Sequence, residues 1–297
     1  MSIFSKILYQ YKNGNYFVTI YPDGTKIRKT MDDDFIPLFP ESIDLKITNY
    51  CENNCPMCHE SSNINGAHAN LNHPFLTTLH KGTELAIGGG NPLSHPELNT
   101  FLHLMKIKGV ICNMTINEID FIKNKERIKK LIDNKLIYGL GISLLNEKYV
   151  EEICDFAKEN TNTVIHLIAG IVDKKIMSKL YDKDLKILLL GYKTFGRGIS
   201  YFNNQITDNI NYLKDNLNDI SGYFKIVSFD NLAIDQLVVQ NNLTEEEFEK
   251  YYMGDDGSFT MYIDLVKEEF GVSSISNTRY KLKDNIIDMF KIVRETK

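Results

Sequence analysis

The chain has 297 residues, 43% of them hydrophobic, which is enough for one large domain with a substantial core. Its formal net charge of −5 gives no electrostatic reason to expect tight binding to nucleic acid. No run of eighteen apolar residues occurs, and the start, Met1 to Lys6, lacks the layout of a signal peptide. Five unevenly placed cysteines fit a reducing compartment, so we expect a soluble cytoplasmic protein without a membrane partner.

Residues 1–37 are expected to form a small amino-terminal unit, a three-stranded antiparallel meander between about residues 6 and 30. Asn13-Gly14 and Asp23-Gly24 are typical of type I′ hairpin turns and are flanked by β-prone runs. Pro37 and Pro40 then separate this unit from a different pattern.

From residue 38 to 223, short apolar runs alternate with amphipathic helices. Strands are predicted near 43–49, 84–88, 110–116, 138–144, 163–169 and 186–191. Helices are predicted near 74–82, 94–108, 123–134, 147–159, 173–182 and 206–217, the second opening with a capping box from Ser94 to Glu97. Six alternating strands predict a parallel sheet in the α/β class, a partial (β/α)6 TIM-type barrel.

Residues 224–297 are expected to form an α+β extension that closes the barrel. The pattern predicts a strand at 224–227, a short helix capped by Thr244, a hairpin of 259–265 with 270–274, and a last helix at 284–294.

Cys51, Cys55 and Cys58 follow directly on the first predicted barrel strand. Three thiolates in one loop can hold three irons of a 4Fe-4S cluster, and the fourth iron then keeps the open position that a chemically active metal site needs. The loop lies at the carboxyl end of a parallel strand, where α/β proteins build their sites. The alternative is a zinc site in an interaction module, with His59 as the fourth ligand.

This cysteine spacing, followed one strand later by Gly88-Gly89-Gly90 and Asn91, resembles the radical S-adenosylmethionine (AdoMet) superfamily over roughly residues 40–200. The resemblance implies that Cys51, Cys55 and Cys58 hold a 4Fe-4S cluster and that AdoMet chelates the fourth iron. It further implies a reductive cleavage to a 5′-deoxyadenosyl radical, with an electron donor such as flavodoxin or ferredoxin. No cysteine follows Cys154, so a second cluster in a SPASM-like carboxyl-terminal domain is not expected.

The resemblance also assigns cofactor contacts. Gly88, Gly89 and Gly90 look like the family's segment that contacts the AdoMet amino group, with Asn91 where an acidic residue is often found. Met57 stands where the family commonly places an aromatic residue near adenine. A tight turn is the alternative role of the glycines.

Three strand residues are further cofactor candidates. Ser143 and Asn117 resemble polar residues that contact the ribose, and each could instead cap local backbone. His166 lies in a segment that resembles the one flanking adenine, and a packing role is its alternative.

Two cations and one cysteine complete the candidates. Lys193 and Arg197 follow the sixth strand and could bind the AdoMet carboxylate or an anionic substrate group, or could be surface charges. Cys112 and Cys154 are expected to pack in the core, but an inward-facing Cys112 could donate a hydrogen atom to a substrate radical.

We therefore predict a radical AdoMet enzyme that abstracts hydrogen from an unidentified peptide or small molecule. The alternatives are a nucleotide-modifying enzyme, a glycyl-radical activating enzyme, or the zinc-bearing module.

Overall fold

The computed structural model describes residues 6–296. The first five residues, on which the expectation of no signal peptide largely rests, lie outside this part. No helix among the described residues is long and apolar enough to cross a membrane.

The amino-terminal meander is present as a separate three-stranded sheet in the order β1-β2-β3. Its strands are antiparallel neighbours: β1 (Tyr9–Asn13), β2 (Tyr16–Ile20) and β3 (Lys26–Lys29). Gly14 and Gly24 take the positive φ values, 60° and 91°, that the two turns require. Tyr16 and Val18 of β2 are fully buried, so one face of this sheet packs against the rest of the protein.

A second sheet of ten strands forms the body of the protein, in the order β10-β9-β8-β7-β6-β5-β4-β11-β12-β13. Its strands from β10 to β11 run parallel to their neighbours, and the last two are antiparallel. The bounds are β4 (Ser42–Thr48), β5 (Glu84–Gly89), β6 (Ile111–Asn117), β7 (Gly139–Ser143), β8 (Thr163–Ile168), β9 (Lys186–Leu190), β10 (Ile226–Phe229), β11 (Thr260–Asp264), β12 (Glu269–Gly271) and β13 (Tyr280–Lys281).

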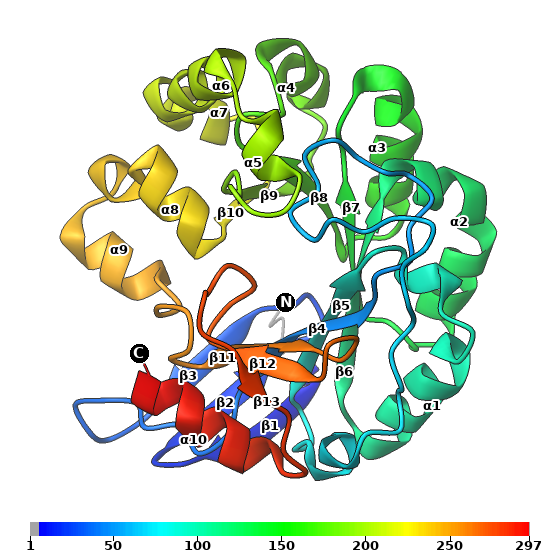
Figure 1. Ribbon diagram of the computed structural model, residues 1–297. Helices are drawn as coiled ribbons and strands as arrows, with labels where there is room; N and C mark the ends of the chain where they lie inside the picture. Colours follow the sequence, from blue (N-terminus) through cyan, green and yellow to red (C-terminus); the bar gives the residue numbers. More distant parts are fainter. Residues whose placement is uncertain (1–5, 297) are drawn as a thin grey trace.

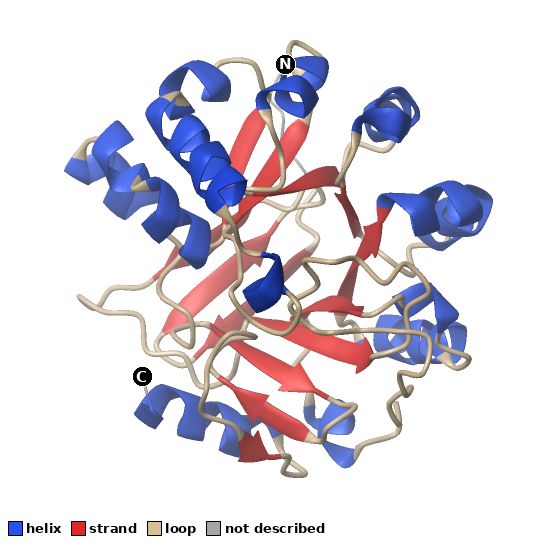
Figure 2. Ribbon diagram, turned by 45° about the horizontal axis from the view of Figure 1, so that its top comes forward, coloured by secondary structure: helices blue, strands red, loops and turns tan. Residues whose placement is uncertain are grey.

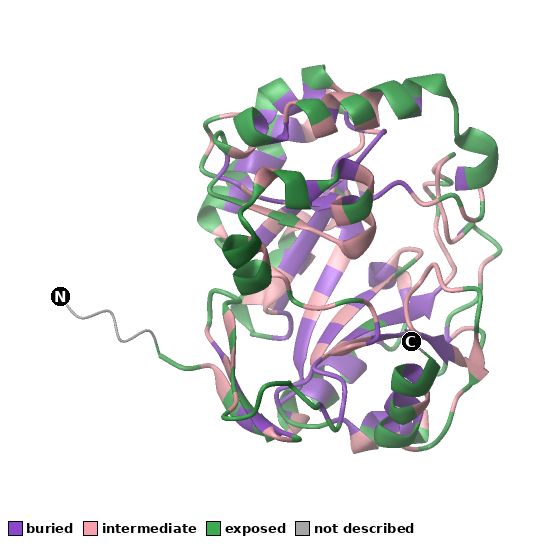
Figure 3. Ribbon diagram, turned by 90° about the vertical axis from the view of Figure 1, so that its left-hand side faces the viewer, coloured by how far each residue is buried: buried purple, intermediate pink, exposed green. Residues whose placement is uncertain are grey.

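Most helices lie on the outer side of this curved sheet, and the short α5 lies inward of the others (Figures 1 and 2). The helices are α1 (Leu98–Lys108), α2 (Glu118–Asp133), α3 (Val150–Glu159), α4 (Lys174–Leu180), α5 (Gly198–Tyr201), α6 (Asn204–Asp215), α7 (Leu217–Ser221), α8 (Asn231–Leu237), α9 (Glu245–Tyr251) and α10 (Ile286–Thr296). Short 3-10 turns are η1 (Pro74–Thr78), η2 (Pro92–Ser94), η3 (Glu147–Tyr149) and η4 (Val239–Asn242). Figure 3 shows buried strands behind helices whose outer faces are exposed.

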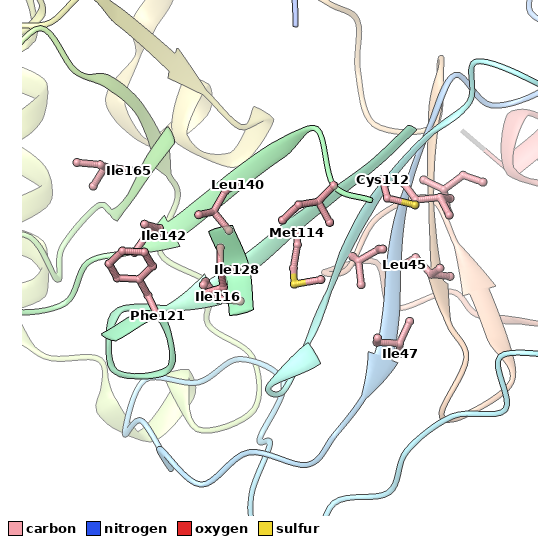
Figure 4. Close-up of a cluster of buried hydrophobic side chains, with 14 of the residues drawn as sticks. Leu45, Ile47, Cys112, Met114, Ile116, Phe121, Ile128, Leu140, Ile142 and Ile165 are labelled. Carbon is pink, nitrogen blue, oxygen red and sulfur yellow. The ribbon is translucent and has the colours of Figure 1, made fainter. Parts of the chain in front are cut away.

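Strand alternation separates the core from the barrel interior. On β6, Cys112, Met114 and Ile116 pack with side chains of the covering helices in the main hydrophobic cluster (Figure 4). Asn113 and Thr115, between them, line a cavity on the other face. Successive strand residues point to opposite faces, so the apolar residues make the sheet-helix core and the polar ones face inward.

The alternation of parallel strands with helices confirms the predicted α/β class, and the sheet contains more strands than the six expected. β10 continues the parallel order beside β9, and β11 pairs with β4 at the other end. Both come from residues 224–297, so this segment extends the sheet at both sides. The division at residues 37 and 223 stays a prediction.

Two local predictions are wrong. Ser94 does not cap a helix, because its hydroxyl donates to the Asn91 carbonyl, and α1 begins later, after Glu97, without a side-chain cap. The helix expected at 74–82 is only the 3-10 turn η1.

Candidate functional site

The three cysteines of the triplet lie in the loop that follows β4, at the carboxyl end of that strand. Cys51, Cys55 and Cys58 are half-buried, unpaired thiols. The Cys58 amide donates to the Cys55 carbonyl at 3.2 Å, and the Cys51 amide donates to the carbonyl of Asn63 at 3.0 Å. The second bond closes the loop onto its own far end. The cysteine loop, residues 49–63, therefore has a defined backbone shape.

Arg197 holds the cysteine loop from the segment after β9. Its Nε donates to the Cys55 carbonyl at 3.0 Å, its Nη2 donates to the Ser62 carbonyl at 2.9 Å, and its backbone amide donates to the Cys58 carbonyl at 3.1 Å. A Cβ on the preceding Gly196 would lie 2.4 Å from the His59 carbonyl oxygen, so the two loops touch. The side chain predicted to bind an anion thus makes two hydrogen bonds to the cysteine loop.

Two asparagines tie the loop to α2. The Asn117 Oδ1 accepts from the Ile119 amide at 2.9 Å and caps α2, while its Nδ2 lies 3.9 Å from the Cys55 sulfur. Asn53, inside the loop, donates to Asp120 at 2.6 Å. The predicted ribose contact therefore lies beside the cysteines and also has the local capping role.

The three thiols influence one another. Burial and, to a smaller extent, the neighbouring thiolates of Cys51 and Cys58 raise the pKa of Cys55 to about 11 against the opposing charge of Arg197. Burial also raises the pKa of Cys51. Thiolates are what an iron-sulfur cluster requires, and the three thiols lie within one short loop.

Among the described residues, no three side chains of His, Cys, Asp or Glu are grouped to hold a single metal ion. In a 4Fe-4S cluster each cysteine binds a different iron, so its donors surround a volume instead of converging on one point. The donor types, the closed loop and the mutual influence of the thiols fit such a cluster.

The three glycines after β5 differ in their surroundings. A Cβ on Gly89, whose φ is 111°, would lie 2.3 Å from the Thr48 carbonyl oxygen, and one on Gly90 would lie 2.2 Å from that of Tyr50. A Cβ on Gly88 would meet nothing within 4 Å. Gly89 and Gly90 are thus required where β5 packs against the start of the cysteine loop, and only Gly88 leaves open space.

Asn91 is used locally as well. Its Oδ1 accepts from the Leu93 amide at 3.0 Å and caps η2, and its own amide donates to the Tyr50 carbonyl at 2.7 Å. The turn therefore follows the rim of the cysteine loop.

Asn117, Ser143 and His166 are brought into one row across the sheet. They are register partners on β6, β7 and β8, so their side chains share the inner face. A Cβ on Gly141 would lie 2.3 Å from the His166 ring, which therefore lies over β7 on the amino-terminal side of Ser143. Burial lowers the pKa of His166 to about 4 and keeps the imidazole neutral.

Lys193, Met57 and Cys112 have different placements. Lys193 donates to the Ser274 hydroxyl at 3.0 Å and thereby contacts the loop between β12 and β13. The Met57 carbonyl faces Gly198, next to Arg197. Cys112 is 1% exposed in the core between the sheet and the helices, so the inward orientation that a hydrogen-donor role requires is not met. Burial raises its pKa to about 12.

An ion network that the sequence reasoning did not single out joins β4 and β11 to the end of the cysteine loop. Lys46 lies 2.5 Å from Glu60 and 2.9 Å from Asp264, and the Tyr262 hydroxyl donates to Glu60 at 3.1 Å. Burial alone would raise the pKa of Glu60, but Lys46 and the other partners hold it below its usual value. The alternation Ile43-Asp44-Leu45-Lys46 was the available signal, since it predicts a polar inner face for β4.

Two further titratable groups lie near this network. Asp44 is on the inner face of β4 with Lys46, where its side chain reaches the solvent inside the barrel. The surrounding barrel wall separates it from bulk water and raises its pKa to about 6, while the positive charge of Lys193 opposes the shift. His59, the proposed zinc ligand, lies 3.6 Å from Glu60, and burial lowers its pKa to about 4.

Comparisons with known proteins give structural matches alone. No family model matches the sequence, and no curated protein matches it. Three solved structures of SuiB from Streptococcus suis share its fold. The first, bound to S-adenosylmethionine, has a TM-score of 0.59 at 14% identity over 88% of this chain and 68% of that chain. The second, bound to the precursor peptide SuiA, has a TM-score of 0.59 at 14% identity and covers 86% of this chain and 65% of that one.

The third, also a structure of SuiB, has a TM-score of 0.60 at 13% identity over 98% of this chain and 88% of that one. Identities this low show a common fold. The chain spans about two thirds of the length of the two ligand-bound SuiB chains.

Proposed function

We propose that this protein is a radical AdoMet enzyme that modifies a peptide. The observation that carries the proposal is the cysteine loop, with Cys51, Cys55 and Cys58 at the carboxyl end of β4, where Asn117 of the inner row lies 3.9 Å from the Cys55 sulfur. The shared fold with SuiB, which was solved with S-adenosylmethionine and with a precursor peptide, supports both the cofactor and the substrate class.

In this proposal the three cysteines hold a 4Fe-4S cluster. The bound cluster and AdoMet would supply a reductive cleavage of AdoMet and hydrogen abstraction from the substrate. The chain's own residues have structural tasks. Arg197 keeps the carbonyls of Cys55 and Ser62 in place, so the thiols stay oriented. Asn117 lies beside Cys55 and offers an amide near its sulfur.

The inner row offers the groups that could contact AdoMet. Gly88 lets a ligand approach the backbone, and Ser143 offers a hydroxyl on the same inner face. We assign Lys193 to a carboxylate, because the hydrogen-bond partner of its amine, the Ser274 hydroxyl, is neutral. Arg197 is not assigned this role, since its guanidinium is already bonded to two carbonyls.

Anaerobic reconstitution with iron and sulfide, followed by dithionite and AdoMet, tests the proposal. We expect about four irons per chain, from the cluster stoichiometry, and formation of 5′-deoxyadenosine and methionine. Purified protein that contains zinc and no iron, and that cannot be reconstituted, would instead favour the zinc module. A loaded cluster that never cleaves AdoMet would exclude the radical reaction.

Peptide modification needs a separate measurement. Unlabelled AdoMet, mixed with candidate precursor peptides that are deuterated in their side chains, should yield 5′-deoxyadenosine that carries deuterium from the peptide. Transfer from a nucleotide and from none of the peptides would replace the peptide substrate with the nucleotide alternative while leaving the radical chemistry intact.

A further inference from the structure

The amino-terminal half of the barrel is hollow. A cavity of about 500 Å³ lies on the inner face of β5 to β10, within the size range of ligand sites. We call it the chamber, and its lining includes Ala86, Asn113, Gly139, Gly141, His166 and Ser228. TIM-type barrels usually fill this position with layers of bulky branched side chains. Here small residues on β5 and β7 leave the space open.

The floor of the chamber is the turn between β2 and β3, residues 21–25. Asn162, before β8, donates to the Pro22 carbonyl at 2.7 Å, and the Lys186 amine at the start of β9 lies 3.5 Å from the Asp23 carbonyl. The amino-terminal meander is thereby attached to the barrel beneath the cavity. This gives the meander a role as the base of a partly open cavity.

One polar group in the wall has no protein partner. The His166 imidazole makes no hydrogen bond within the described part of the chain, and its ring lies flat over Gly141. A neutral imidazole offers one donor and one acceptor. His166 is half-buried, and its ring nitrogens are not among the covered polar atoms, so water or a ligand in the chamber can supply these bonds.

The charged groups of the chamber lie in the floor turn and at the amino ends of the strands. Glu84 forms an ion pair with Lys26 at 2.5 Å, the Asp23 carboxylate accepts from the Thr25 amide at 3.0 Å, and the Lys186 amine meets the Asp23 carbonyl. The wall around His166, further along the strands, combines apolar side chains such as Val164 and Leu188 with the small residues. An ion bound beside His166 would lose its hydration without gaining an opposite charge, so this part of the lining favours an uncharged ligand.

We propose that the chamber is a binding site for an uncharged small molecule that hydrogen-bonds to His166. It is distinct from the cysteine loop, since its lining includes the first residues of β5, β6, β7 and β9, at the opposite ends of the strands. Binding there requires neither iron nor AdoMet. It can therefore be tested on the protein before reconstitution, and its failure would leave the proposed function untouched.

Benzamide, benzoate and benzamidine are suitable probes, because they share a ring and differ in charge. Titration calorimetry should show benzamide binding at least about tenfold more tightly than either ion, a difference of about 1.4 kcal/mol. A crystal soaked in benzamide should show the ring in the chamber and the amide at His166. Tighter binding of either ion would overturn the uncharged class. No binding, with only ordered water in the chamber, would overturn the site.

Two variants locate the binding. Ser228→Phe places a ring inside the chamber and should abolish benzamide binding, whereas the matched control Ser178→Phe, on the exposed face of α4, should retain it. His166→Leu removes the hydrogen bond and should weaken binding about tenfold. Unchanged binding in Ser228→Phe, in a protein with a wild-type circular dichroism spectrum, would mean that the probe binds elsewhere.

Discussion

At the carboxyl ends of the strands, Arg197 and Asn117 donate hydrogen bonds to the cysteine loop and Asp120 accepts one from it, whereas at the amino ends the barrel contains a chamber walled by small residues. Several polar side chains at the first end bond to one another or to the backbone, although the buried Asn49 Oδ1 and Ser62 Oγ of the loop have no hydrogen-bond partner. At the second end His166 has no protein partner. The candidate residues beside the cysteine loop therefore act mainly by shaping that loop, while His166 in the chamber remains available to a ligand.

The largest expected effect comes from the cysteines themselves. Cys58→Ala should remove one of the three thiolate ligands and reduce both bound iron and AdoMet cleavage to background. Cys154→Ala is the matched control, because this thiol is buried in α3 and should cost only about 1 kcal/mol of folding free energy. The iron content and the yield of 5′-deoxyadenosine are measured for both variants. Equal iron in both variants would contradict the assignment of the loop.

Gly90 should tolerate no side chain. Gly90→Ala places a Cβ against the Tyr50 carbonyl and should lower the free energy of unfolding by about 2–4 kcal/mol. Gly88→Ala should leave the fold as stable as before, because its Cβ would meet nothing, yet weaken AdoMet binding if the open space holds the cofactor. Urea unfolding and AdoMet titration separate the two effects. Similar stability losses in both variants would show that the glycines are equivalent after all.

Arg197 should matter for the shape of the loop more than for anion binding. Arg197→Gln loses charged hydrogen bonds to two carbonyls, and we expect unfolding free energy to fall by about 2–3 kcal/mol together with a lower iron content. Arg294→Gln removes a comparable bond to the Pro37 carbonyl, far from the cysteines in the chain, and should leave iron content unchanged. An Arg197 variant that loads iron normally but binds AdoMet poorly would restore the anion-binding role predicted from the sequence.

Asp44 should give the smallest effect, visible as a pH dependence. Its pKa in the folded protein is raised to about 6, so the folded state holds a proton that the unfolded state has lost, and Asp44 lowers stability as pH rises through about 6. Lys193 faces it with one positive charge and Asp230 and Asp256 with negative charges. Asp44→Asn should therefore raise the melting temperature at pH 8 and have little effect at pH 4. The same increase at both pH values would contradict the titration.

The periodicity of the chain predicted most of the fold because each strand and helix is encoded locally. The runs at Ile43 to Thr48 and Lys186 to Leu190 are β-prone by themselves, and the turn pairs at Gly14 and Gly24 specify the meander. The pairing of β11 with β4 could not be obtained this way. It joins segments more than 200 residues apart through hydrogen bonds that leave no pattern in either strand.

The sequence by itself determined which chemistry the loop can support, because the spacing of Cys51, Cys55 and Cys58 is a local property of eight consecutive residues. It identified polar residues that lie beside the loop, but it did not predict which groups their side chains would bond to. Only the tertiary structure decided that Arg197 and Asn91 bond to backbone, that Cys112 faces the helices, and that small residues on separate strands enclose a chamber. Those outcomes depend on which side chains meet across the sheet, and strand pairing, not sequence spacing, sets that.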